Sequence, residues 1–110
     1  MRQSFTAVVE RNVQWQGDFA VEPYEAAWAT EAIYFVRVLD AANVPNDAVA
    51  RVQISPDGIR WCDEGTTISL SPTEGVTFAR LSHFGGWLRL VGKLADGAQM
   101  TVIVYLALKE

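Results

Sequence analysis

The chain has 110 residues, half of them hydrophobic and 11% aromatic, which is enough apolar material for one packed domain and excludes a disordered chain. Its formal net charge is −4 and its nine lysines and arginines are scattered along the sequence, so we expect no nucleic-acid partner. The single cysteine, Cys62, excludes an intramolecular disulfide, and we expect neither a cofactor nor a metal site.

The first predicted element is a strand that ends near Gln16. Its apolar residues alternate with polar ones, which is the period of a strand with one buried face. The apolar set is Phe5, Ala7, Val9, Val13 and Trp15. Arg11 interrupts this face and indicates a bulge or a sheet edge. The strand should end in a turn at Gln16–Asp18, because that turn contains Gly17.

The next segment permits two interpretations. Five large or apolar residues lie at helical spacing, and Pro23 suits a first helical turn. These five are Tyr24, Trp28, Ala32, Phe35 and Leu39. Ile33–Val38, however, is one of the most β-prone runs in the chain. We therefore predict a strand over Ala32–Asp40 and an extended strand over 19–29, with a short helix as the alternative for the latter.

A β-hairpin is predicted over Val49–Trp61, which reads VARVQISPDGIRW. Apolar and polar residues alternate before the turn and again after it. The turn has suitable chemistry because Pro56 presets φ, Asp57 can bond to its own backbone and Gly58 accepts a positive φ.

The remaining elements follow the same alternation of strands and turns. Turns or loops are predicted at Asn43–Asp47, Ser71–Gly75, His83–Gly86 and Ala95–Gly97, and strands at Thr67–Leu70, Val76–Leu81, Trp87–Lys93 and Met100–Lys109. About eight short strands separated by turns predict an all-β, single-domain antiparallel sandwich of jelly-roll type over residues 1–110. The predicted core contains Val52, Ile54, Leu88, Leu90, Val102, Val104 and Leu106.

No catalytic cluster is recognisable in this pattern. His83 is the single histidine and precedes Gly85–Gly86, which is typical of a loop. Nothing resembles the nucleophile elbow that positions a catalytic serine. We therefore expect no catalytic residues and no enzyme.

The sequence SPDGIRW at Ser55–Trp61 resembles the S-x-DG-x-x-W hairpin of discoidin-like jelly rolls. It also resembles the hairpin of small β-sandwich proteins of tailed-phage virions, of the decoration or tail-associated type. Discoidin domains are longer and carry a pair of disulfide-forming cysteines, whereas this chain has one cysteine. The virion resemblance implies a non-catalytic protein that assembles on a larger surface, and it assigns no site residues.

The first functional hypothesis is a structural or interaction protein that self-associates or coats a larger assembly, such as a virion decoration or tail component. In the last strand, the face that carries Ile103, Tyr105 and Ala107 is too apolar for free solvent. We expect Ile103 and Tyr105 to contact a partner, which is a second copy of the chain or a larger protein assembly.

The alternative hypothesis is a small carbohydrate-binding module with glycans as partners. Trp61 and Trp87 are candidates for stacking on sugar rings, and Arg89 shares the predicted face of Trp87. Asp57 and Asp63 lie near Trp61 in the sequence and would bond to sugar hydroxyls.

The expected location rests on the N-terminus and on the longest apolar run. Met1–Gln16 carries Arg2, Glu10 and Arg11 and lacks the apolar stretch of a signal peptide. Met100–Leu108 is too short to span a bilayer. We expect a protein that is made in the cytoplasm without a signal peptide, has no membrane partner and reaches any exterior location within an assembly such as a virion.

Overall fold

A computed structural model describes residues 3–110; Met1 and Arg2, on which the signal-peptide prediction partly rests, lie outside the described residues. The described chain forms nine strands and no helix, and therefore no helix that could cross a membrane. The strands are β1 (Ser4–Gln16), β2 (Asp18–Ala20), β3 (Tyr24–Glu25), β4 (Glu31–Ala42), β5 (Val49–Ser55), β6 (Cys62–Ser69), β7 (Val76–Ser82), β8 (Trp87–Lys93) and β9 (Gln99–Lys109).

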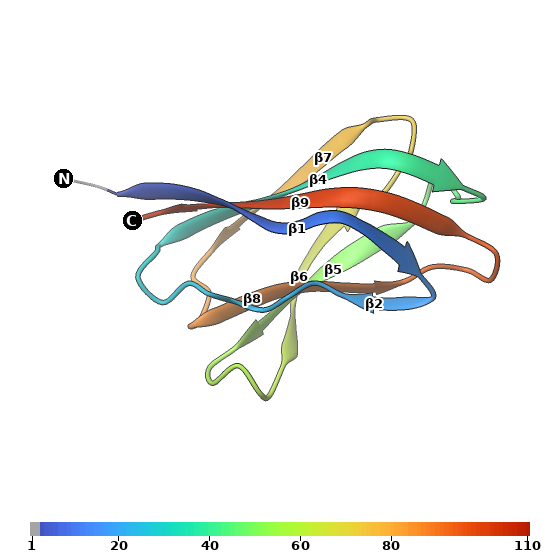
Figure 1. Cartoon of the computed structure of the whole chain (residues 1–110). Coiled ribbons are helices and arrows are strands. Elements are labelled where there is room, and N and C mark those ends of the chain that lie inside the picture. The colour runs from blue at the N-terminus through green and yellow to red at the C-terminus, as the bar shows by residue number, and fades with distance from the viewer. Residues whose placement is uncertain (1–2) are drawn as a thin grey trace.

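The strands form two antiparallel sheets that pack face to face (Figure 1). Sheet I has the order β1-β9-β4-β7. Sheet II has the order β2-β8-β5-β6, and β3 also pairs with β8. The short β2 and β3 both pair with β8 as one interrupted strand, so eight strands are divided between two four-stranded layers, as in a jelly roll. The predicted all-β sandwich is confirmed.

The predicted strand over Ala32–Asp40 is confirmed as β4, and the helical interpretation is wrong. The β-prone run forms the centre of β4 and pairs with β7 on one side and β9 on the other. The predicted extended strand over 19–29 is confirmed only in part. The chain forms β2 and β3 with an interruption around Pro23, which cannot donate to a ladder. It then ends in a turn in which the N–H of Ala29 donates to the carbonyl of Ala26. The interruption at Arg11 is a bulge, since the β1–β9 register shifts between Glu10 and Val13.

Two sequence predictions need correction around the β5–β6 hairpin. The connection is a six-residue loop, Pro56–Trp61, so alternation does not resume at Ile59 as predicted. The predicted short strand Thr67–Leu70 is not separate but is the end of β6, which starts at Cys62. The register of the β5–β6 pair shifts between Arg51 and Gln53, which interrupts the alternation of inward and outward residues in β6. The sequence pattern therefore predicted only the end of this strand.

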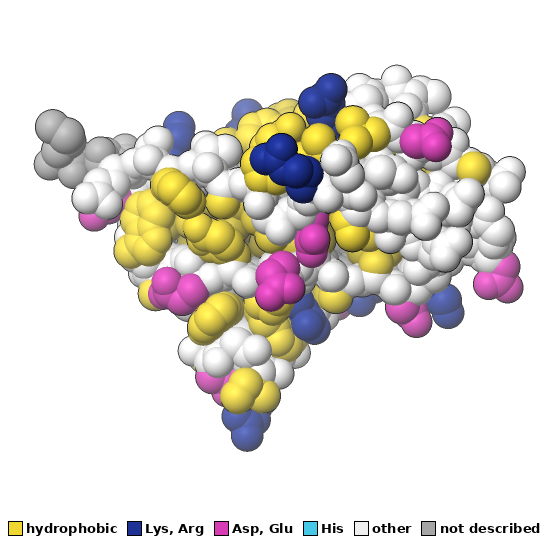
Figure 2. Space-filling model, viewed as in Figure 1, with side chains coloured by type: hydrophobic (Ala, Val, Ile, Leu, Met, Phe, Trp, Pro, Cys, Tyr) yellow, Lys and Arg dark blue, Asp and Glu magenta, His cyan; other side chains and the backbone are white. Residues whose placement is uncertain are grey.

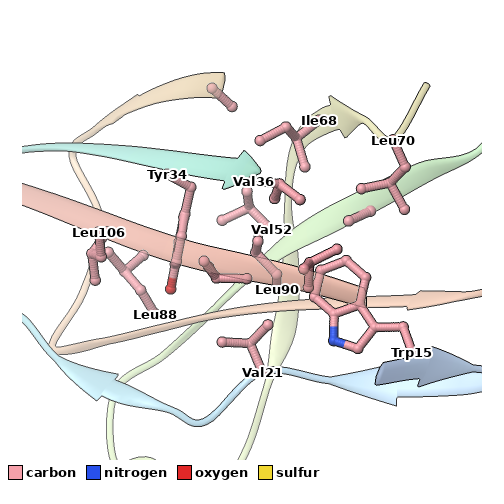
Figure 3. Packing of buried hydrophobic residues seen from close by; sticks show 14 of the residues in the cluster. Trp15, Val21, Tyr34, Val36, Val52, Ile68, Leu70, Leu88, Leu90 and Leu106 are labelled. Carbon is pink, nitrogen blue, oxygen red and sulfur yellow. The ribbon is translucent and has the colours of Figure 1, made fainter. Parts of the chain in front are cut away.

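The core lies between the sheets and is built from the inward residues of every long strand (Figure 3). Six of the seven predicted core residues are fully buried: Val52, Leu88, Leu90, Val102, Val104 and Leu106. Ile54 is packed against the core but only partly buried, because it lies at the end of β5 where the loop begins. Trp15 is 3% exposed and stacks on Phe19 with ring centroids 4.0 Å apart, which joins sheet I to sheet II.

Candidate functional site

The loop between β5 and β6 is ordered by its own side chains. The hydroxyl of Ser55 accepts hydrogen bonds from the backbone N–H groups of Asp57 (3.2 Å) and Gly58 (2.8 Å). The Asp57 carboxylate accepts from the N–H groups of Ile59 (2.8 Å) and Arg60 (2.9 Å) and from the Arg60 guanidinium (2.9 Å). The backbone donors of Arg60 and Ile59 are the main cause that lowers the pKa of Asp57 to about 2. Both oxygens of Asp57 therefore serve the loop.

The indole ring of Trp87 packs against this loop at Gly58. Gly58 has φ +80°, and a Cβ atom at that position would lie 3.1 Å from Cε2 of Trp87. Glycine is therefore required at position 58 both by the backbone conformation and by the indole beneath it. Trp87 is half-buried, and its ring is committed to the loop. In the SPDGIRW hairpin, Ser55, Asp57 and Gly58 thus have structural roles.

A row of bonded polar side chains crosses the outer face of sheet II. Asp63 of β6, Gln53 of β5 and Arg89 of β8 are cross-strand neighbours. Nε and Nη2 of Arg89 donate to Oε1 of Gln53 at 2.9 and 2.7 Å, and Nε2 of Gln53 donates to Oδ1 of Asp63 at 2.9 Å. Nε of Arg51 lies 3.5 Å from the same Asp63 oxygen. The hydrogen bond from Gln53, followed by the charge of Arg51, lowers the pKa of Asp63.

Trp61 joins this row through Arg89. The Cζ atom of Arg89 lies 4.3 Å from the centroid of the Trp61 ring, which is a cation–π contact. Trp61 is half-buried, so part of the indole remains open to solvent. We call Trp61, Arg89, Gln53 and Asp63 the polar row. It presents an aromatic plane beside a guanidinium, an amide and a carboxylate whose positions are fixed by mutual contacts.

The outer face of sheet I is different in character. Val8, Tyr105, Phe35 and Phe78 are successive cross-strand neighbours on β1, β9, β4 and β7. Phe78 is 50% exposed, and its ring centroid lies 6.1 Å from that of Phe35. We call these four residues the apolar row. Figure 2 shows hydrophobic side chains together with Lys and Arg side chains on the upper surface, over sheet I.

Ile103 and Arg80 flank the apolar row on sheet I. Ile103 lies beside it on β9, with Arg37 of β4 as its cross-strand partner. The guanidinium of Arg80 lies 4.9 Å from the Phe78 ring centroid. The proposed interface residues Ile103 and Tyr105 are therefore on the outer surface of the sandwich and partly exposed.

Of the five binding residues predicted from the sequence, three come together in the polar row: Trp61, Arg89 and Asp63. Trp87 and Asp57 instead build the loop at the end of sheet II.

Sequence reasoning missed Gln53, which connects Arg89 to Asp63, and it missed Phe35 and Phe78 as outward aromatics. The strand period could have identified the last two. Trp28 lies in the loop after β3, outside both rows, and is 38% exposed.

Within residues 3–110, no group of three or more His, Cys, Asp and Glu side chains is arranged to hold a metal ion. His83 lies in the β7–β8 loop and lines a shallow groove of about 380 Å³ with Glu31, Ser82 and Phe84. This groove is open to solvent rather than enclosed. Such surfaces suit contact with an extended ligand better than enclosure of a small one.

The sequence matches no family model and no curated protein. Among solved structures, the chain is similar to CpGH89CBM32-5, a carbohydrate-binding module from Clostridium perfringens in complex with GalNAc-β-1,3-galactose, with a TM-score of 0.49, 11% identity and 94% of both chains covered. It is also similar to dimeric latent PorU from Porphyromonas gingivalis, with a TM-score of 0.46 and 12% identity over 99% of this chain but 13% of that one. Neither likeness is close enough to assign a ligand.

Proposed function

We propose that this chain is a non-catalytic glycan-binding module that uses the outer face of sheet II. The observation that carries the proposal is the polar row, in which Arg89 stacks on Trp61 and is bonded through Gln53 to Asp63. A sugar has apolar ring faces that favour an aromatic plane and hydroxyls that need hydrogen-bond partners when they leave water. The polar row offers both within one surface.

The contacts within the row reduce the cost of binding. Arginine and glutamine lose considerable side-chain freedom when a ligand orders them. In this chain, two bonds from Arg89 to Gln53 and one from Gln53 to Asp63 hold these side chains before any ligand arrives. The guanidinium covers one face of the Trp61 indole, so a sugar would contact the part of the ring that solvent reaches.

The test is glycan binding by purified protein, measured on a glycan array and then by isothermal titration calorimetry. Trp61→Ala should weaken binding by about five- to thirtyfold, because loss of a stacking plane costs roughly 1–2 kcal/mol. Trp28→Ala is the matched control, since Trp28 is also exposed but lies outside the polar row. Equal binding by Trp61→Ala and wild-type protein, both correctly folded by circular dichroism, would reject the proposal.

The second candidate function is self-association through sheet I, and the apolar row favours it. The row spans all four strands of that sheet, and its outer edge residue Phe78 is half exposed. A second copy placed face to face would remove these side chains from water, as the inner faces of a sandwich do. A role as a virion coat or tail component stays a prediction that rests on the SPDGIRW hairpin.

Sedimentation velocity tests this candidate over a range of protein concentrations. We expect a dimer at high micromolar concentration and a shift to monomer in Phe78→Lys, which places a charge in the apolar row. A wild-type protein that remains monomeric throughout the range would exclude self-association by this face.

A further inference from the structure

A shallow groove of about 340 Å³ lies beside the polar row on the outer face of sheet II. Arg51, Arg89 and Lys93 line it, together with the carboxylate of Asp18. A third of the nine lysines and arginines therefore gather in this groove, although the chain as a whole has a net charge of −4. We propose that the groove binds an acidic group, a carboxylate or a sulfate, of the glycan that contacts Trp61. This inference rests on the glycan-binding function proposed above.

The floor of the groove is apolar, and this strengthens the electrostatic attraction of its cations for an anion. Val91 belongs to the outward-facing set of β8 but is only 8% exposed, and Gly92 beside it has no side chain. Arg51 is the cross-strand neighbour of Val91, while Arg89 and Lys93 stand on either side of it on the same face of β8. Charges above an apolar floor are less screened than charges surrounded by water.

Two of the cations are already held in place by neighbouring groups. Arg89 uses Nε and one N–H of Nη2 for Gln53, so Nη1 and the second N–H of Nη2 are left to face a ligand. Arg51 approaches Asp63 through Nε, which leaves its two terminal nitrogens for a ligand. A planar guanidinium that is fixed through one edge can present another edge to two oxygens of a carboxylate or a sulfate.

The carboxylates near the groove do not cancel its charge. Asp63 is ion-paired with Arg51, and Asp18 is the cross-strand neighbour of Lys93 without an ion pair between them in the described chain. Three cations against these two carboxylates leave a net positive charge beside the indole of Trp61. An acidic sugar is therefore favoured over a neutral one of the same shape.

The test compares the binding of three probes by isothermal titration calorimetry at 50 and 300 mM NaCl. Oligogalacturonate carries carboxylates, and a heparin-derived oligosaccharide carries sulfates as well. The third probe is a neutral galacto-oligosaccharide. The key variant is Lys93→Gln, because Lys93 is exposed and its loss should not disturb the fold. Lys93→Arg keeps the charge and serves as the conservative control. Arg37→Gln removes a charge from the outer face of sheet I and controls for net charge.

We expect an acidic probe to bind to the wild-type protein more tightly than the neutral probe does. Binding of the acidic probe should be roughly fivefold weaker in Lys93→Gln and near normal in Lys93→Arg and Arg37→Gln. It should also be several-fold weaker at 300 mM than at 50 mM NaCl. Comparison of the two acidic probes identifies the acidic group. The opposite result is that neutral and acidic probes bind equally, and that binding falls in Trp61→Ala but not in Lys93→Gln. This result would overturn the proposal that the groove binds an acidic group, and would keep the proposed glycan-binding function.

Two further outcomes separate the two proposals. Acidic-probe binding that falls in Lys93→Gln but not in Trp61→Ala would support the groove and reject stacking on Trp61. Failure of every probe to bind would reject both.

Discussion

The two outer faces of this sandwich are built from the same strand pattern and yet differ in how their side chains are used. On sheet II, outward residues of β5, β6 and β8 bond to one another and hold a guanidinium on Trp61. On sheet I, outward residues of β1, β9, β4 and β7 form the apolar row, in which Phe35 and Phe78 meet at a centroid distance of 6.1 Å. One face is organised before any partner arrives, whereas the other would gain most from being covered.

The largest expected loss of stability comes from a substitution at a closely packed glycine in sheet II. Gly92 lies in β8, and a Cβ atom there would be 2.5 Å from Cζ of Phe19. The Phe19 ring cannot move away easily because it stacks on Trp15 at 4.0 Å. Gly92→Ala should therefore lower the free energy of unfolding by about 1–3 kcal/mol, measured by urea denaturation.

Two variants sharpen that prediction. Gly86→Ala should be tolerated, because the nearest atoms to a Cβ there are 3.9 and 4.0 Å away. The double variant Gly92→Ala with Phe19→Leu should recover part of the lost stability, since the shorter side chain relieves the collision. Additive losses in the double variant would contradict the packing argument.

A matched pair of arginines compares the two faces directly. Arg89 lies 4.3 Å from the Trp61 ring centroid and also makes two bonds to Gln53, while Arg80 lies 4.9 Å from the Phe78 ring centroid. Arg89→Ala should cost about 1–2 kcal/mol of unfolding free energy, and Arg80→Ala less than about 0.5 kcal/mol. Similar losses in both variants would show that sheet II is not the more organised face.

The space between the sheets provides a third prediction. Tyr34 of β4 is fully buried, and its hydroxyl, which points toward the opposite sheet in Figure 3, has no hydrogen-bond partner among the described residues. Burial raises the pKa of this phenol well above its usual range. Tyr34→Phe should raise the unfolding free energy by about 1 kcal/mol, because it removes an unpaired polar group. A loss of stability would indicate that a buried water satisfies the hydroxyl.

The smallest expected effect is local and depends on pH. The pKa of Asp57 is about 2, below its ordinary value of 3.8, so the stabilisation of the loop by the carboxylate is complete above pH 4 and is lost as the pH falls through 2. The amide signals of Ile59 and Arg60 in NMR spectra should titrate near pH 2 and lose this transition in Asp57→Asn. A midpoint near pH 4 would contradict the bonded carboxylate.

Much of the fold could be predicted from strand periodicity. The pattern in β8 placed Leu88 and Leu90 inward and Trp87, Arg89 and Val91 outward, as the structure has them. Turn chemistry located Gly58 and Gly97, both of which have positive φ. Periodicity failed where the ladder is irregular, since a bulge in the β5–β6 pairing shifted the alternation of β6.

The candidate surfaces were less accessible to sequence reasoning because they depend on register. Phe35 and Tyr105 are 70 residues apart, and their pairing follows only from the β4–β9 ladder. Gln53 is an ordinary outward polar residue by sequence, and its role appears only when Arg89 and Asp63 flank it on neighbouring strands. Single strands can be predicted from local pattern, whereas sites that span several strands require the tertiary fold.

The most direct test of the account maps the ligand onto one face or the other. Oligogalacturonate is titrated into ¹⁵N-labelled protein, and backbone amide and tryptophan indole signals are followed in two-dimensional NMR spectra. We predict shifts for Gln53, Asp63 and Arg89 and for the Trp61 indole, with the signals of Phe35, Phe78 and Tyr105 unchanged. Shifts confined to the apolar row, or no shifts on either face, would contradict the assignment of sheet II as the ligand-binding face.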